Sequence, residues 1–161
     1  MKLLNWLEKW EMKSLKFTPP FLQMEWSTQE ADKNAAWALY IELLTRITTQ
    51  PLPTEDGDEK TALDSVYSLF AITREVIREQ GPECINFTKI AIVVLNQVVR
   101  PFTAKWHRKS LAGDFDNETE RAIFREELAA LQAELREYTR MLADIAEVED
   151  LTNLEVTEET E

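Results

Sequence analysis

The chain has 161 residues, which suits a single domain, and its 44% apolar residues are enough to build a hydrophobic core. One cysteine and one histidine exclude an internal disulfide framework and a Cys-rich or His-rich metal site, so we expect no metal and no cofactor. The net charge of −12 disfavours general nucleic-acid binding, because contacts to phosphate need a positive surface.

The charge is unevenly distributed along the chain. Residues 141–161 contain eight acidic residues and no basic residue, so this segment carries −8 of the −12. Residues 84–113 contain no acidic residue but five basic residues and the only histidine. Such a segment is typical of a buried helix followed by a solvent-exposed turn, and it also contains the side chains that an anion site uses.

Residues 1–20 are expected to be an N-terminal segment with an amphipathic helix over residues 2–17. Its apolar side includes Leu3, Trp6, Leu7 and Trp10 and is interrupted by Glu8 and Glu11, and lysines line the other side. A helix of this kind packs on its own domain, binds a partner protein or lies on a membrane surface. Thr18-Pro19-Pro20 ends it.

Residues 21–148 are expected to form the helical domain. Ser27 and Glu30 have capping-box spacing, which predicts a helix from there to about Thr48. A second helix is expected over residues 60–80, closed by Gly81-Pro82. Its inward-facing residues are expected to be Leu63, Val66, Tyr67, Phe70 and Ile77.

Residues 83–99 are apolar on most sides, which predicts a central helix that Arg100-Pro101 breaks or kinks. Asn117 is expected to cap the last helix. This helix has an apolar stripe with heptad spacing, which packs within the bundle or across a dimer: Phe124, Leu128, Leu131, Leu135, Tyr138, Leu142 and Ile145. The predicted fold is therefore all-α, an antiparallel bundle of four main helices with an N-terminal amphipathic helix and an acidic C-terminal tail over residues 149–161.

Arg100 and His107 are the candidate catalytic pair. Six residues separate them, and this spacing resembles the Arg-x(4–6)-His motif of the HEPN superfamily, small helical proteins that include metal-independent ribonucleases. The resemblance implies that Arg100 stabilises the scissile phosphate and His107 transfers protons. Pro101 stands where the family has a polar residue, and it predicts that the two side chains do not share one helix face.

The same segment has two other interpretations. Lys105, Arg108 and Lys109 are candidate anion-binding residues for a nucleotide phosphate or an acidic partner. Alternatively, Trp106 and Phe102 pack on the bundle while Arg100 and His107 pair with neighbouring helix ends. The common phosphate-binding, metalloprotease and serine-hydrolase motifs do not occur in the sequence.

Three stretches, AAWALYIELLTRITTQPL, ALDSVYSLFAITREVI and VLNQVVRPFTAKWHR, give the chain a wider resemblance. They resemble a group of small helical bacterial proteins of anti-phage and conflict gene neighbourhoods. This resemblance implies an accessory part that works with a larger partner.

From the sequence we favour a non-catalytic helical interaction module with a protein partner or a second copy of itself. The expected contact surfaces are the apolar side of residues 3–17, with Leu3, Trp6, Leu7 and Trp10, and the heptad stripe of the last helix. The alternatives are a HEPN-like ribonuclease, the one case with a nucleic-acid partner, and a peripheral membrane protein that uses residues 2–17. We expect a cytoplasmic location, with the surface of the inner membrane as the alternative.

Overall fold

The computed structural model describes residues 28–154, and this part of the chain is all-α, as the sequence predicts. The expected helix over residues 2–17 lies outside the described residues, as do residues 21–26, which the sequence predicts to be a short extended arm, and Ser27. The α-helices are α3 (Glu30–Leu44), α4 (Glu59–Gln80), α5 (Ile85–Val93), α6 (Arg100–Leu111) and α7 (Glu118–Ala146).

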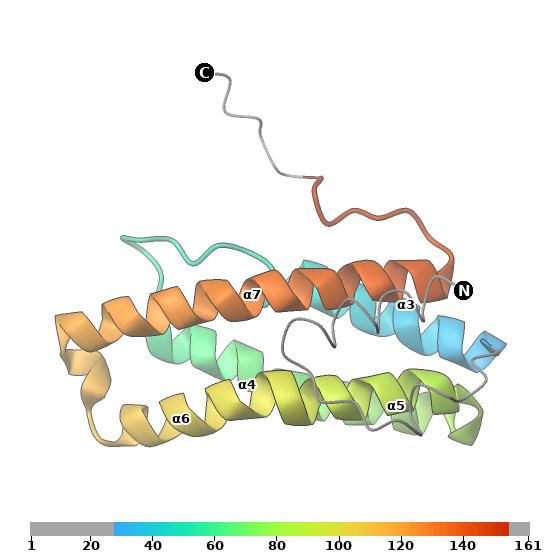
Figure 1. Ribbon diagram of the computed structural model, residues 1–161, viewed down its shortest axis with the longest axis horizontal. Coiled ribbons are helices and arrows are strands. Elements are labelled where there is room, and N and C mark those ends of the chain that lie inside the picture. Colours follow the sequence, from blue (N-terminus) through green and yellow to red (C-terminus); the bar gives the residue numbers. More distant parts are fainter. Residues whose placement is uncertain (1–27, 155–161) are drawn as a thin grey trace.

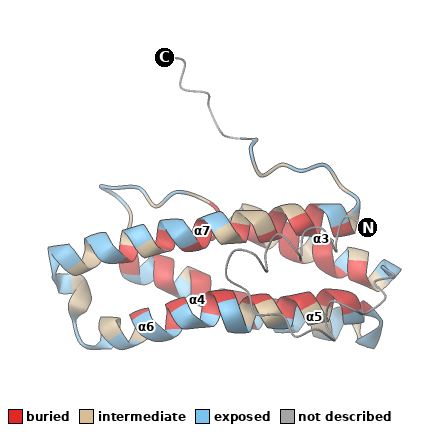
Figure 2. Ribbon diagram, viewed as in Figure 1, coloured by how far each residue is buried: buried red, intermediate tan, exposed pale blue. Residues whose placement is uncertain are grey.

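Helix α5 continues into α6 as one long rod, and α3, α4, this rod and α7 run in alternating directions along the long axis of the molecule (Figure 1). Helix α3 packs against α7 and α4, and α4 packs against α6. The buried sides of the helices face one another around one core (Figure 2). Each helix contributes at least one large side chain that is fully buried, among them Tyr40, Leu63, Phe87, Trp106 and Phe124.

Helix α3 begins and ends differently from the prediction. Glu30 is its first residue, and Gln29 is the N-cap. The carboxylate of Asp32, which is fully buried, accepts the Gln29 backbone N–H at 2.9 Å and the Phe87 backbone N–H at 2.9 Å. Asp32 therefore caps the first turn of α3 and satisfies a backbone donor at the start of α5.

The helix ends at Leu44 instead of near Thr48. The hydroxyls of Thr48 and Thr49 both donate to the Leu43 carbonyl, and the side chain of Gln50 donates to the Leu44 carbonyl. These side chains supply the hydrogen bonds that another helical turn would have made.

Three long side chains of α7 hold the loop over residues 45–58. Arg125 donates to the carbonyls of Leu52, Pro53 and Gly57 and pairs with Glu59. Gln132 donates to the carbonyls of Ile47 and Gln50, and Arg136 donates to that of Thr49. The loop is therefore fixed to α7 through its backbone, a feature that the sequence did not predict.

The sequence predicts a break or a kink at Arg100-Pro101, and the helix does not break there. A π-helical segment, Val94–Val99, connects α5 to α6, and the Arg100 N–H donates to the Leu95 carbonyl five residues earlier. A wider turn of this kind accommodates a residue that lacks an N–H and whose ring would crowd the preceding turn. Pro101 itself lies in the first turn of α6, where proline is tolerated.

The heptad stripe of α7 is confirmed as a buried surface. All seven of its residues are at most 8% exposed, and they are buried within this one chain. The side chain of Asn117 accepts the Glu120 N–H at 3.2 Å, so the expected cap is also confirmed. After α7, the Tyr40 hydroxyl donates to the Glu149 carbonyl and accepts the Leu151 N–H, which fixes the start of the acidic tail.

Candidate functional site

Helix α6 places Arg100 and His107 on the same side, contrary to the expectation from Pro101. Seven residues correspond to nearly two full turns, so the two side chains point in similar directions and their Cα atoms are separated by roughly 10.5 Å along the axis. Both side chains contact α4.

On α4, Tyr67 and Phe70 receive these two side chains. The central carbon of the Arg100 guanidinium lies 4.6 Å from the centre of the Phe70 ring. The His107 ring packs edge-on against Tyr67, with centroids 4.7 Å apart, and Tyr67 contacts Phe70 in turn. Tyr67 was expected to face inward, but it is 52% exposed because α6 covers Phe70 and leaves Tyr67 at the edge of the contact.

A carboxylate stands at one end of this arrangement. The Nε2 atom of His107 lies 3.9 Å from the Oδ1 atom of Asp64, and Asp64 also pairs with Lys60. A separation of 3.9 Å exceeds hydrogen-bond distance, so Asp64 attracts the imidazole only when the imidazole is protonated. We call Asp64, Tyr67, Phe70, Arg100 and His107 the α4–α6 row.

The row contains groups that could act on a phosphodiester. The imidazole of His107 can transfer a proton, and the guanidinium of Arg100 can bind a phosphate oxygen. In this structure the guanidinium stacks on Phe70 while its Nε donates to Asn96 at 3.1 Å.

Of the three candidate anion-binding residues, Lys105 and Lys109 place their amino groups 5.3 and 5.4 Å from the centre of the Trp106 ring, and both pair with carboxylates. Lys105 pairs with Glu127, which also accepts the indole N–H of Trp106 at 2.8 Å. Partial burial raises the pKa of Glu127, but the hydrogen bonds from Lys105 and Trp106, together with the positive charges of Lys105 and Lys109, outweigh it and lower the pKa overall.

Lys109 lies 2.8 Å from Glu120 and 3.2 Å from Asp114, and its hydrogen bonds to these two carboxylates raise its pKa. The charges of Lys105 and Lys109 are thus compensated by acids on α7 and on the preceding turn. Arg108 is exposed and has no ion pair within residues 28–154.

The other residues that the sequence singled out are placed as follows. Leu3, Trp6, Leu7 and Trp10 lie outside the described residues. Within the described range, no group of three or more His, Cys, Asp or Glu side chains is placed to hold a metal ion. Cys84 is fully buried, and its thiol lies 3.1 Å from the Gly81 carbonyl.

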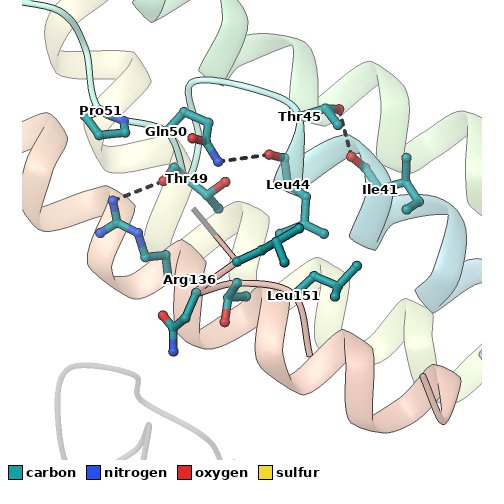
Figure 3. A pocket seen from close by; sticks show the side chains of 11 residues that line it. Ile41, Leu44, Thr45, Thr49, Gln50, Pro51, Arg136 and Leu151 are labelled. Carbon is teal, nitrogen blue, oxygen red and sulfur yellow. Dashed lines mark hydrogen bonds between the residues drawn. The ribbon is translucent and has the colours of Figure 1, made fainter. Parts of the chain in front are cut away.

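The structure also contains a groove that the sequence reasoning missed. It is open, has a volume of about 930 Å³, and is formed by the end of α3, the following loop, α7 and the C-terminal segment (Figure 3). Its apolar lining is Ile41, Leu44, Pro51, Leu151 and Leu154. The sequence signal was available, because Trp37, Ile41 and Leu44 have i, i+4, i+7 spacing and so form an apolar stripe on α3.

Comparisons of the chain with models of protein families, with curated proteins and with solved structures find no match. Across residues 28–154, none of the helices combines the length and the apolar character that crossing a membrane requires. The function is therefore inferred from the geometry of the described surfaces.

Proposed function

We propose that the protein is a non-catalytic interaction module that binds a larger partner protein through the α4–α6 row. The observation that carries this proposal is the half-exposed ring of Tyr67, which contacts the rings of both Phe70 and His107. Tyr and Arg are enriched among the residues that contribute most to binding at protein interfaces.

Pre-ordering of the row supports this use. Tyr67 and Arg100 already make ring contacts, so less side-chain entropy is lost when a partner covers them. Asp64 at one end and Arg100 at the other give a partner one carboxylate and one guanidinium for orientation.

The contacts that Arg100 and His107 make support the proposal that the protein is not a catalyst. The guanidinium stacks on an aromatic ring, and the carboxylate nearest to the imidazole is beyond hydrogen-bond distance. The resemblance to small proteins of anti-phage gene neighbourhoods supports a role as the accessory component of a bacterial defence system.

The test is affinity capture from the cells that naturally express the protein, followed by titration of the purified partner. We expect one protein to be retained by the wild type and by Ile92→Ala, a control on the exposed side of α5. Tyr67→Ala should weaken its binding by roughly 30-fold, the effect of a 2 kcal/mol hot spot. A partner that binds wild type and Tyr67→Ala equally would refute the assignment of this surface.

A HEPN-like ribonuclease is the second candidate. It is favoured by one observation, namely that Arg100 and His107 share one side of α6 beside Asp64. This candidate predicts that the purified protein cleaves RNA in EDTA and that His107→Ala and Arg100→Ala abolish cleavage. Folded wild-type protein that leaves RNA intact with and without the captured partner would exclude it.

A further inference from the structure

Helix α3 has two apolar sides, but the described residues cover only one of them. Ala36, Tyr40 and Leu43 are fully buried in the core. On the other side, Trp37 is 46% exposed and Ile41 is 38% exposed, and the stripe leads into the groove. Exposed apolar side chains that lie together along one helix often mark a binding surface, so this stripe is expected to have an occupant.

The groove suits an apolar occupant because the polar groups along it already have partners. The Thr45 hydroxyl donates to the Ile41 carbonyl, the Gln50 amide donates to the Leu44 carbonyl, and Arg136 donates to the Thr49 carbonyl (Figure 3). Apolar side chains remain for a ligand to contact, and Leu154 at the rim is 73% exposed.

We propose that residues 2–17 of the same chain dock in this groove and along the exposed stripe of α3 as an amphipathic helix. Its apolar side, with Leu3, Trp6, Leu7 and Trp10, faces Trp37, Ile41 and Leu44. This inference goes beyond the proposed function, because the groove and the α4–α6 row are formed by different residues.

The length of the connection permits this docking. The 15 residues of α3 span about 22 Å, and the groove is at the C-terminal end of this helix. Residues 18–27 lead to the N-terminal end of α3 and can extend to about 33 Å. The connection is therefore long enough for the preceding segment to return along α3 to the groove.

The charges are complementary as well. Residues 2–17 carry four lysines, Lys2, Lys9, Lys13 and Lys16, against Glu8 and Glu11, so their net charge is +2. Directly after the rim residue Leu154, the chain continues with four acidic residues and no basic one, namely Glu155, Glu158, Glu159 and Glu161. Attraction between these two segments favours the docked state and weakens as salt is added.

The test is amide hydrogen exchange of the full-length protein, read by mass spectrometry in the peptides that cover residues 2–17. We expect protection in the wild type. The groove variants Ile41→Glu and Leu154→Glu should each raise exchange by about tenfold, since either places a charge against an apolar ligand. Ile92→Glu is the matched control, an isoleucine on α5 that is 52% exposed, and it should leave exchange unchanged.

A second variant tests the charge contribution. Replacing the four glutamates of residues 155–161 by glutamine should remove most of the salt dependence of the protection.

The proposal is overturned by any of four results: no protection in the wild type, equal exchange in the groove variants and the control, protection that grows with protein concentration, or protection that requires anionic vesicles. The third would indicate docking onto a second copy, and the fourth a membrane surface. None of these readouts depends on Tyr67, so failure here leaves the proposed function standing.

Discussion

Replacing Asp32, a small side chain, should strongly lower the free energy of unfolding of the protein. Its carboxylate is fully buried and accepts backbone N–H groups from Gln29 and Phe87, so it joins the starts of two helices that are distant in the sequence. Asp32→Ala leaves both donors without this acceptor. Each lost hydrogen bond to a charged group costs about 1.5 kcal/mol, which gives roughly 3 kcal/mol in total.

This loss is large against the roughly 5–15 kcal/mol that stabilises a typical domain. The assay is urea unfolding followed by circular dichroism, where a lower midpoint with an unchanged slope reports a loss of stability. Asp56→Ala is the matched control, because Asp56 is exposed in the loop before α4, and it should cost less than about 0.5 kcal/mol. If Asp32→Ala and Asp56→Ala shift the midpoint equally, the buried carboxylate does not have this role.

Three further changes test other contacts. The pKa of Glu127 is lowered in the folded state, so this carboxylate stabilises the fold above its ordinary pKa and the contribution is lost as the pH falls through the lowered value. The difference in unfolding free energy between wild type and Glu127→Gln should therefore be largest at neutral pH and shrink on acidification; a pH-independent difference would contradict this. Tyr40→Phe removes both hydrogen bonds to the chain after α7, so the Leu151 amide should exchange faster while circular dichroism stays unchanged. Arg125→Ala should expose the loop over residues 45–58 to limited proteolysis, and Arg125→Lys should rescue it only in part, since lysine lacks the planar fork that reaches several carbonyls. Equal digestion of the two Arg125 variants would show that charge alone does not hold the loop, whereas full rescue by lysine would show that it does.

Local patterns in the sequence predicted the features that depend on local interactions. The closure of α4 at Gly81, the Asn117 cap and the buried stripe of α7 are all confirmed. Each depends on residues within a few positions of one another, where backbone geometry and side-chain spacing determine the result.

The errors arose where distant residues decide the structure. Thr48 and Thr49 end α3 together with the bonds from α7 to the loop, and helix spacing alone could not indicate this. Tyr67 has the spacing of a core residue, but the crossing of α6 over α4 leaves it at the edge.

The candidate site follows the same division. Arg100 and His107 were identifiable from their spacing, whereas their contacts with Phe70, Tyr67 and Asp64 depend on packing between α4 and α6. The stripe of α3 could have been found from sequence, but the groove requires the C-terminal segment, which Tyr40 fixes across more than a hundred residues.

The most direct test of the proposed function, a module that binds without cleaving, is RNA integrity in bacteria that express the protein. Wild type and His107→Ala are produced at matched levels, and total RNA is compared with that of cells carrying an empty vector. We predict intact ribosomal RNA in all three cultures, and the same result when the purified protein and its captured partner are incubated with RNA in EDTA. RNA that is degraded by the wild type and spared by His107→Ala would contradict the proposed function and establish that catalysis requires His107.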